Sequence, residues 1–192
     1  MPARPFGLNL FRMAEMTLLG LCGSLREGSH NRKLMLEAAR AFGGAFDEAG
    51  LRFPLYDGDL EEAEGIPDIV QRAADQIAAA DAVIVVSPEY NKSVTGVLKN
   101  ALDWISRVEG NPWKDKPVAI LSANDGREGG ARGQFALRLA LNYARPRLLT
   151  GPEVMVADAS NAFDDEGRLL SERYAKQVKA LMDALRAEAA RG

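Results

Sequence analysis

The stretch AVIVVSPEYNKSVTG, residues 82–96, decides the fold class of this chain. It begins with a short run that is apolar throughout and rich in β-branched residues, with Asp81 before it and Ser87 and Pro88 after it. A strand that is covered on both faces has this pattern, which is typical of the centre of a parallel sheet. The polar residues that follow therefore form a loop at the carboxyl end of a central strand, where open α/β sheets bind their ligands.

Strand and helix patterns alternate on both sides of this stretch. Apolar runs predict strands at residues 17–22, 51–56, 82–87 and 117–122, and a fifth strand within residues 148–157, around Val154. Apolar residues at helical spacing predict helices at residues 31–50, 66–77, 97–108, 131–144 and 174–185, and an acidic loop precedes the second helix. This alternation predicts a single doubly wound α/β domain over residues 17–192, with helices on both faces of its sheet.

Composition and charge exclude several classes of protein. Lys and Arg number 24 and Asp and Glu number 27, giving a formal net charge of −3. Proteins that bind duplex nucleic acid usually carry a basic excess, so nucleic acid is not an expected partner. Cys22 is the only cysteine and His30 the only histidine, so neither an internal disulfide nor a histidine-rich metal site or triad is expected. The cysteine usage fits the cytoplasm, and no apolar run approaches the roughly 18 residues of a membrane helix.

The segment at residues 1–16 differs from the rest of the chain. It carries Arg4 and Arg12 and has no acidic residue before Glu15. It lacks the apolar segment and the small-residue cleavage site that a signal peptide needs. We expect either a tail or an extension from an upstream start codon, with the domain beginning after it.

A polar loop, GSLREGSHN at residues 23–31, follows the first predicted strand. It offers the hydroxyls of Ser24 and Ser29, the guanidinium of Arg26 and the free backbone amides of a helix N-terminus, which together favour a phosphate group. Two glycines have the spacing of a Walker A loop, but Ser29 stands where that motif has lysine, so NTP hydrolysis is disfavoured. The pattern indicates a monophosphate cradle. The alternative is an ordinary polar turn with a helix cap.

Two further loops follow central strands. In the loop at residues 88–96, Tyr90 can stack on a planar ring and Asn91 can read the polar edge of that ring. The alternative is a turn that leads into a helix. The loop SANDGREGGAR, residues 122–132, contains three glycines that permit close approach of the backbone to a ligand. The alternative there is a flexible surface loop.

Together, the three loops resemble those of the NAD(P)H-dependent FMN reductases, a family of flavodoxin-like proteins that includes quinone, azo and chromate reductases. The resemblance rests on GSLREGSHN at residues 23–31, PEYNKSVTGVLKNALDWIS at residues 88–106 and GGAR at residues 129–132. It covers residues 17–188. The chain departs from the family pattern at Thr95, where members often have proline or another small residue, and at Asn124 and Asp125, where they are richer in Ser and Gly.

The resemblance implies a flavodoxin-like, five-stranded parallel sheet with FMN at its C-terminal edge. The implied phosphate ligands are Ser24, Arg26, Ser29 and Asn31, and His30 is either a further contact or an exposed polar residue at a helix start. The flavin ring would lie between two groups of residues, with Pro88, Glu89, Tyr90 and Asn91 on one side and Ser122 and Gly126 on the other.

The resemblance also implies a reaction and an assembly. NADPH or NADH would deliver hydride to flavin N5, and electrons would then pass to a quinone, free flavin, azo compound or metal oxyanion. This chemistry belongs to the cofactor and requires no protein nucleophile and no metal. Members of the family form dimers, often paired into tetramers, so a homodimer or homotetramer is implied.

Two other functional classes stay open. A flavodoxin-type electron carrier is usually strongly acidic so that it docks on basic partners, and a net charge of −3 disfavours that class. A flavin-binding regulatory protein without catalysis is compatible with the fold, because fold does not fix function.

Several residues also have two interpretations. We expect Cys22 to be a core residue and Trp104 and Ile105 to lie in the core or a subunit interface, while Arg127, Glu128 and Arg132 either contact the dinucleotide or another subunit, or are solvated.

Overall fold

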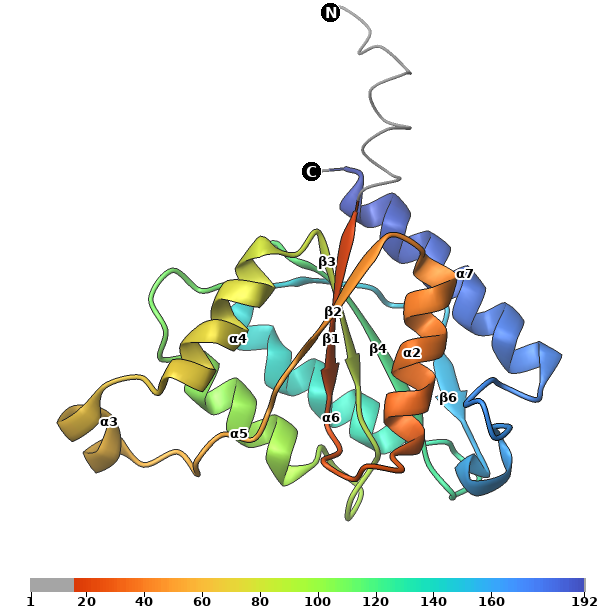
Figure 1. Cartoon of the computed structure of the whole chain (residues 1–192), viewed down its shortest axis with the longest axis horizontal. Helices are drawn as coiled ribbons and strands as arrows, with labels where there is room; N and C mark the ends of the chain where they lie inside the picture. Colours follow the sequence, from red (N-terminus) through yellow and green to blue (C-terminus); the bar gives the residue numbers. More distant parts are fainter. Residues whose placement is uncertain (1–15, 192) are drawn as a thin grey trace, which may run out of the picture.

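The computed structural model describes residues 16–191, and its strands form one parallel sheet in the order β2-β1-β3-β4-β5 (Figure 1). This is the strand order of flavodoxin-like folds, with the switch in direction between β1 and β3. The predicted doubly wound α/β class is therefore confirmed. The strands are β1 (Thr17–Cys22), β2 (Ala45–Ala49), β3 (Ala82–Val86), β4 (Pro117–Ala123), β5 (Arg147–Leu148) and β6 (Val154–Val156).

The fifth position of the sheet contains two short strands, so the structure has six strands where five were expected. Both pair with β4: β5 lies beside Pro117 and Val118, and β6 lies beside residues 121–123. Pro152, between the two strands, has no backbone N–H with which to continue a ladder, which accounts for the interruption. The strand predicted around Val154 is β6.

Helices cover both faces of the sheet. α2 (His30–Phe42) and α7 (Glu172–Ala189) pack on one face, and α4 (Asp68–Ala79), α5 (Gly96–Ile105) and α6 (Ala131–Leu141) pack on the other (Figure 1). Alternate residues of the central strands face the two layers, so each layer has its own apolar core. Short 3-10 helices lie at Asn142–Ala144 and Ala159–Asn161.

The sequence prediction is wrong between residues 43 and 64. The predicted helix at residues 31–50 ends at Phe42, because Gly43 and Gly44 have φ angles of 69° and 95° that stop it. The second strand is Ala45–Ala49, not residues 51–56, and the acidic loop contains α3 (Gly58–Glu64). β2 pairs with β1 alone, as far as the described residues show, and an edge strand can be polar where a central strand cannot. Its sequence AFDEA therefore gives no strong strand signal.

The buried residues bear out the expected core positions. Cys22, Trp104 and Ile105 are all buried, and the only cysteine of the chain forms no disulfide. Met16 is also buried, and its carbonyl accepts a hydrogen bond from the Ala45 amide, whereas the rest of the predicted tail lies outside the described residues. In residues 16–191 no helix combines the length and apolar character needed to cross a bilayer.

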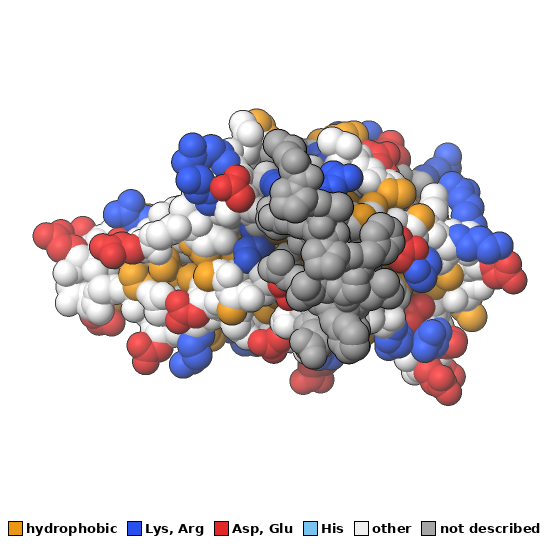
Figure 2. All heavy atoms as spheres, turned by 90° about the horizontal axis from the view of Figure 1, so that it is seen from above, with side chains coloured by type: hydrophobic (Ala, Val, Ile, Leu, Met, Phe, Trp, Pro, Cys, Tyr) orange, Lys and Arg blue, Asp and Glu red, His pale blue; other side chains and the backbone are white. Residues whose placement is uncertain are grey.

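Acidic and basic side chains are interspersed on the face that holds the amino ends of the strands, as Figure 2 shows. The carboxyl ends of the strands lie at the opposite edge of the sheet, at the bottom of Figure 1. That edge carries the loops that the sequence singled out.

Candidate functional site

Three loops meet at the carboxyl edge of the sheet and enclose a small hollow. The first loop (residues 23–29) follows β1, the second loop (residues 87–95) follows β3, and the third loop (residues 124–130) follows β4. The fold brings seven of the eleven predicted cofactor-binding residues together in the lining of this hollow: Ser24, Arg26, Ser29, His30, Asn31, Pro88 and Tyr90. Of the remaining four, Glu89 and Gly126 line an adjoining hollow, while Asn91 and Ser122 line neither.

The first loop is tied to the second at Gly23. The Gly23 amide donates to the Val86 carbonyl, and the Thr95 hydroxyl donates to the Gly23 carbonyl, both at 2.8 Å. A Cβ atom at Gly23 would lie 2.4 Å from the Ser87 hydroxyl oxygen, so only glycine fits between the loops. Thr95 also caps α5 by accepting a hydrogen bond from the Leu98 amide. The departure from the family pattern at Thr95 thus has a structural role.

The N-terminus of α2 points its amides at the hollow. Ser29 is the N-cap of this helix, and its buried hydroxyl accepts a hydrogen bond from the Arg32 amide at 3.2 Å. Within residues 16–191, nothing accepts a hydrogen bond from the backbone amides of His30 and Asn31. Free amides and the positive end of the helix dipole make this position favourable for an anion.

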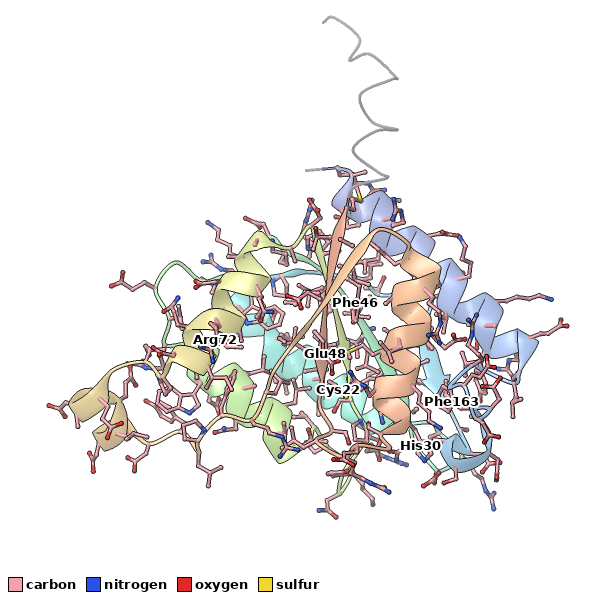
Figure 3. All side chains as sticks on the ribbon, in the orientation of Figure 1. Cys22, His30, Phe46, Glu48, Arg72 and Phe163 are labelled. Atoms are coloured by element: carbon pink, nitrogen blue, oxygen red, sulfur yellow. The ribbon has the colours of Figure 1, made fainter. Side chains whose placement is uncertain are left out.

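The side chains of His30 and Arg26 stand beside these amides. The buried Nδ1 atom of His30 has no partner in the described chain, and the ring stacks on Phe163 with 6.2 Å between centroids (Figure 3). Arg26 is exposed and forms no ion pair with any described residue. Asp125 is the one carboxylate in the lining, and hydrogen bonds from Ser160 lower its pKa. The lining therefore offers several unused donors and one carboxylate that is already hydrogen-bonded.

Asn31 acts differently from its neighbours. Its side-chain amide exchanges two hydrogen bonds with the backbone of Ala123, at the end of β4, and is buried. These bonds hold the start of α2 against the third loop. Only the backbone amide of Asn31 is free toward the hollow.

The second loop contains a tight turn at Asn91 and Lys92. Tyr90 and Ser93 exchange backbone hydrogen bonds of 3.1 and 3.0 Å across it, and the two central residues have φ angles of 50° and 64°. Positive φ at both central positions is typical of a type I′ turn, which asparagine tolerates well. The turn holds the half-exposed Tyr90 ring at the mouth of the hollow and places Asn91 outside it.

Glu89 connects the second and third loops. Its carboxylate accepts a hydrogen bond from the Gly133 amide in the first turn of α6, at 3.0 Å. Its backbone amide donates to the Asn124 side chain, whose own amide group donates to the Glu89 carbonyl. A carboxylate at a helix N-terminus is favourable, so Glu89 fixes the second loop against α6.

The third loop rests on a buried polar pair that the sequence analysis missed in part. The Ser122 hydroxyl donates to the Gly129 carbonyl at 2.6 Å and accepts a hydrogen bond from Gln134 at 2.8 Å. Gln134 was not singled out from sequence. One signal was available. Gln134 stands three positions before Leu137 and seven before Leu141, so its spacing puts a polar residue on the buried side of α6. Gly126, by contrast, has open space where a side chain would be.

Comparison with known proteins places the chain in a family. A family model described as NADPH-dependent FMN reductase matches residues 16–161. The chain belongs to this family. An NAD(P)H-dependent FMN reductase of Pseudomonas aeruginosa is 43% identical over 174 residues, which cover 89% of this chain and 94% of the relative. A quinone reductase of Escherichia coli is 38% identical over 156 residues, which cover 79% of this chain and 83% of the relative.

A solved structure agrees with this assignment. The flavoenzyme NAD(P)H:(acceptor) oxidoreductase FerB of Paracoccus denitrificans has a TM-score of 0.83 at 33% identity and covers 92% of this chain and 98% of its own. The predictions of family, flavodoxin-like fold and enzyme class are therefore confirmed. The chain is an FMN-dependent NAD(P)H oxidoreductase.

Proposed function

We propose that the hollow at the N-terminus of α2 binds the phosphate of FMN. The residues fit this group: the Nδ1 atom of His30 has no hydrogen-bond partner in residues 16–191, and the His30 and Asn31 amides are free. Arg26 is exposed and forms no direct ion pair with a described residue, and its charge helps to lower the pKa of Asp125 in the same hollow. Ser24 and Ser29 add hydroxyls whose protons can be donated. Of these, the side chain of Asn31 is engaged with Ala123, so it contributes through its backbone amide and by positioning.

The flavin ring then lies between the second and third loops. Pro88 and Tyr90 present apolar surface at the mouth of the hollow, and Gly126 leaves the opposite side open for close approach. Asn91, on the adjacent turn, reads the ring edge only if that turn moves toward it. Glu89 and Ser122 have engaged side chains, so their contribution is to hold the two loops in place.

Bound FMN supplies two-electron transfer between a nicotinamide donor, NADPH or NADH, and an organic acceptor, and the protein sets position and access. The open mouth beside Tyr90 admits a planar donor or acceptor above the ring. No described residue has to act as a nucleophile in such a reaction. Quinones are the acceptor class we propose, because the Escherichia coli relative is a quinone reductase. Free flavin, azo compounds and metal oxyanions are the competing acceptors.

An exposed apolar stripe supports a homodimer. Phe135 and Leu139 lie on α6, and Tyr143 lies in the 3-10 helix that follows it. The three stand four residues apart and are 59, 77 and 51% exposed. Several large exposed apolar side chains that follow one another along one segment are unusual on the surface of a monomer. A second copy of this chain is the occupant we propose, with a tetramer formed by pairing two dimers. The cytoplasm is the compartment that we propose for the enzyme.

The unpaired donors around the phosphate position are the observation that carries this proposal. Its test is steady-state oxidation of NADPH and of NADH by the FMN-loaded protein with a benzoquinone as acceptor, compared with an azo dye and chromate. The proposal predicts oxidation that depends on both FMN and the quinone. An FMN-loaded preparation that oxidises neither nucleotide would leave the electron carrier or regulatory protein as the better description.

A further inference from the structure

A buried polar relay runs from α6 to the third loop. The Gln134 amide nitrogen lies 2.8 Å from the Ser122 hydroxyl and 2.8 Å from the Val154 carbonyl. The Ser122 hydroxyl lies 2.6 Å from the Gly129 carbonyl. Gln134 is 2% exposed and Ser122 is 1% exposed, so the relay is shielded from water.

The direction of each bond in this relay is fixed by its ends. The carbonyls of Val154 and Gly129 can only accept, so the Gln134 amide nitrogen must face Val154 and the Ser122 proton must point to Gly129. Ser122 therefore accepts from Gln134 with its lone pair. Such a chain has one hydrogen-bonding arrangement, and it holds the Gly129 carbonyl.

The segment that the relay holds is closely packed and requires glycine. Gly129 and Gly130 have φ angles of 59° and 96°, which side chains rarely adopt. A Cβ atom at Gly129 would lie 2.6 Å from the Met155 backbone, and one at Gly130 would lie 2.9 Å from Ser122. The Gly129 amide in turn donates to the Gly126 carbonyl at 3.0 Å. The position of Gly126 thus follows from the position of Gly129.

Gln134 leaves one of its own atoms without a partner. Its buried side-chain oxygen has no hydrogen bond in the described part of the chain. A buried unpaired acceptor costs free energy, and an apolar residue of similar size would avoid that cost. The residue is therefore poorly explained by core packing, and the relay gives it another role.

We infer that Gln134 is a positioning residue for the flavin ring, acting through Ser122 and Gly129 on the third loop. This inference rests on the proposed function, which puts the ring between the second and third loops. It separates two ends of the cofactor site: the first loop and Arg26 recognise the phosphate, and the Gln134 relay sets the surface that faces the ring.

The test compares Gln134→Met, Ser122→Ala and the double variant in FMN and riboflavin binding to flavin-free protein, followed by flavin fluorescence. Gln134→Met keeps length and burial but removes the amide. It should weaken FMN and riboflavin equally, on the order of tenfold, because both ligands share the ring. The double variant should lose no more flavin affinity than the more affected of the two single variants, since the two residues form one relay. The visible bands of the bound flavin should also shift.

A matched control separates positioning from general destabilisation. Leu137→Ala removes a buried side chain one turn further along α6 that packs in the core and lies outside the relay. It should lower the midpoint of urea unfolding yet leave both affinities and the flavin spectrum unchanged. Gln134→Met with affinities within twofold of the wild type and an unchanged spectrum would overturn the inference. Arg26→Ala, which should weaken FMN alone, tests the proposed function separately, because its selective effect does not depend on Gln134.

Discussion

The side chain of Asn31 and the backbone of Ala123 form a closed pair of hydrogen bonds between the start of α2 and the end of β4. Asn31 Nδ2 donates to the Ala123 carbonyl at 2.8 Å, and the Ala123 amide donates to Asn31 Oδ1 at 2.9 Å. The two residues are 92 positions apart in sequence, and both are buried. This pair joins the phosphate end of the site to the third loop.

Asn31→Ala should therefore destabilise the fold as well as the site. The substitution leaves a buried amide and a buried carbonyl of Ala123 without partners, which costs about 2–4 kcal/mol in free energy of unfolding. Urea denaturation followed by circular dichroism measures it. Asn142→Ala, at an exposed position, is the control and should change the free energy of unfolding by less than about 0.5 kcal/mol. Equal effects of the two substitutions would argue against this account of Asn31.

Glu89 should stabilise α6 rather than act on substrate. Glu89→Ala removes the acceptor for the Gly133 amide and the charge near the helix N-terminus, so unfolding free energy should fall by about 1–2 kcal/mol. Glu89→Gln keeps a hydrogen-bond acceptor but removes the charge, so its free energy of unfolding should fall by about half as much. Thermal unfolding of both variants checks this order. Glu62→Ala, an exposed change on α3, serves as the reference. If Glu89→Ala lowers the free energy of unfolding no more than Glu62→Ala does, Glu89 does not stabilise the N-terminus of α6.

The apolar stripe of α6 and the 3-10 helix after it should control assembly. Leu139→Glu puts a charge into the proposed contact between two copies, so the variant should sediment as a monomer at concentrations where the wild type is a dimer. Leu170→Glu changes another exposed leucine, which is 64% exposed and lies before α7, and should keep the wild-type mass. Analytical ultracentrifugation distinguishes the two results. A wild-type monomer, or a Leu139→Glu dimer, would contradict the proposed interface.

Cys22 should behave as a packed thiol. Burial raises the pKa of the Cys22 thiol, which donates a weak hydrogen bond to the Ser24 carbonyl at 3.5 Å. Because the thiolate is the reactive form, alkylation by iodoacetamide should be at least about tenfold slower in the folded protein than in urea. The rate in the folded protein should still be rising at pH values where free cysteine has reached its plateau. A folded-state rate equal to the unfolded rate would show that the thiol is open to solvent.

The sequence predicted the central strands and the loops that follow them for a clear physical reason. β3 is covered on both faces, so its apolar run is unmistakable, and parallel strands bring their carboxyl ends to one edge. β2 was misplaced because it lies at the edge, where Asp47 and Glu48 are tolerated. The Gly43 and Gly44 pair was the better marker of the helix end.

The sequence could not show which predicted residues face the cofactor position. Asn31, Glu89 and Ser122 carry the right chemistry, but their side chains are engaged with partners 92, 44 and 7 positions away in the chain. Those partners are set by tertiary packing, which no local pattern reports. Gln134 was overlooked for the same reason, since its partners lie on β4 and β6.

The most direct test of the phosphate position is the affinity of the flavin-free protein for FMN and for riboflavin, measured for the wild type, Arg26→Ala and Arg127→Ala. Arg26 lines the hollow at the start of α2, whereas Arg127 lines the adjoining one. A charge-assisted hydrogen bond to phosphate contributes roughly 1.5–3 kcal/mol, so Arg26→Ala should weaken FMN about tenfold or more and leave riboflavin unchanged. Arg127→Ala should preserve the wild-type preference for FMN. Equal losses of FMN and riboflavin in Arg26→Ala would contradict the assignment of this hollow to the phosphate.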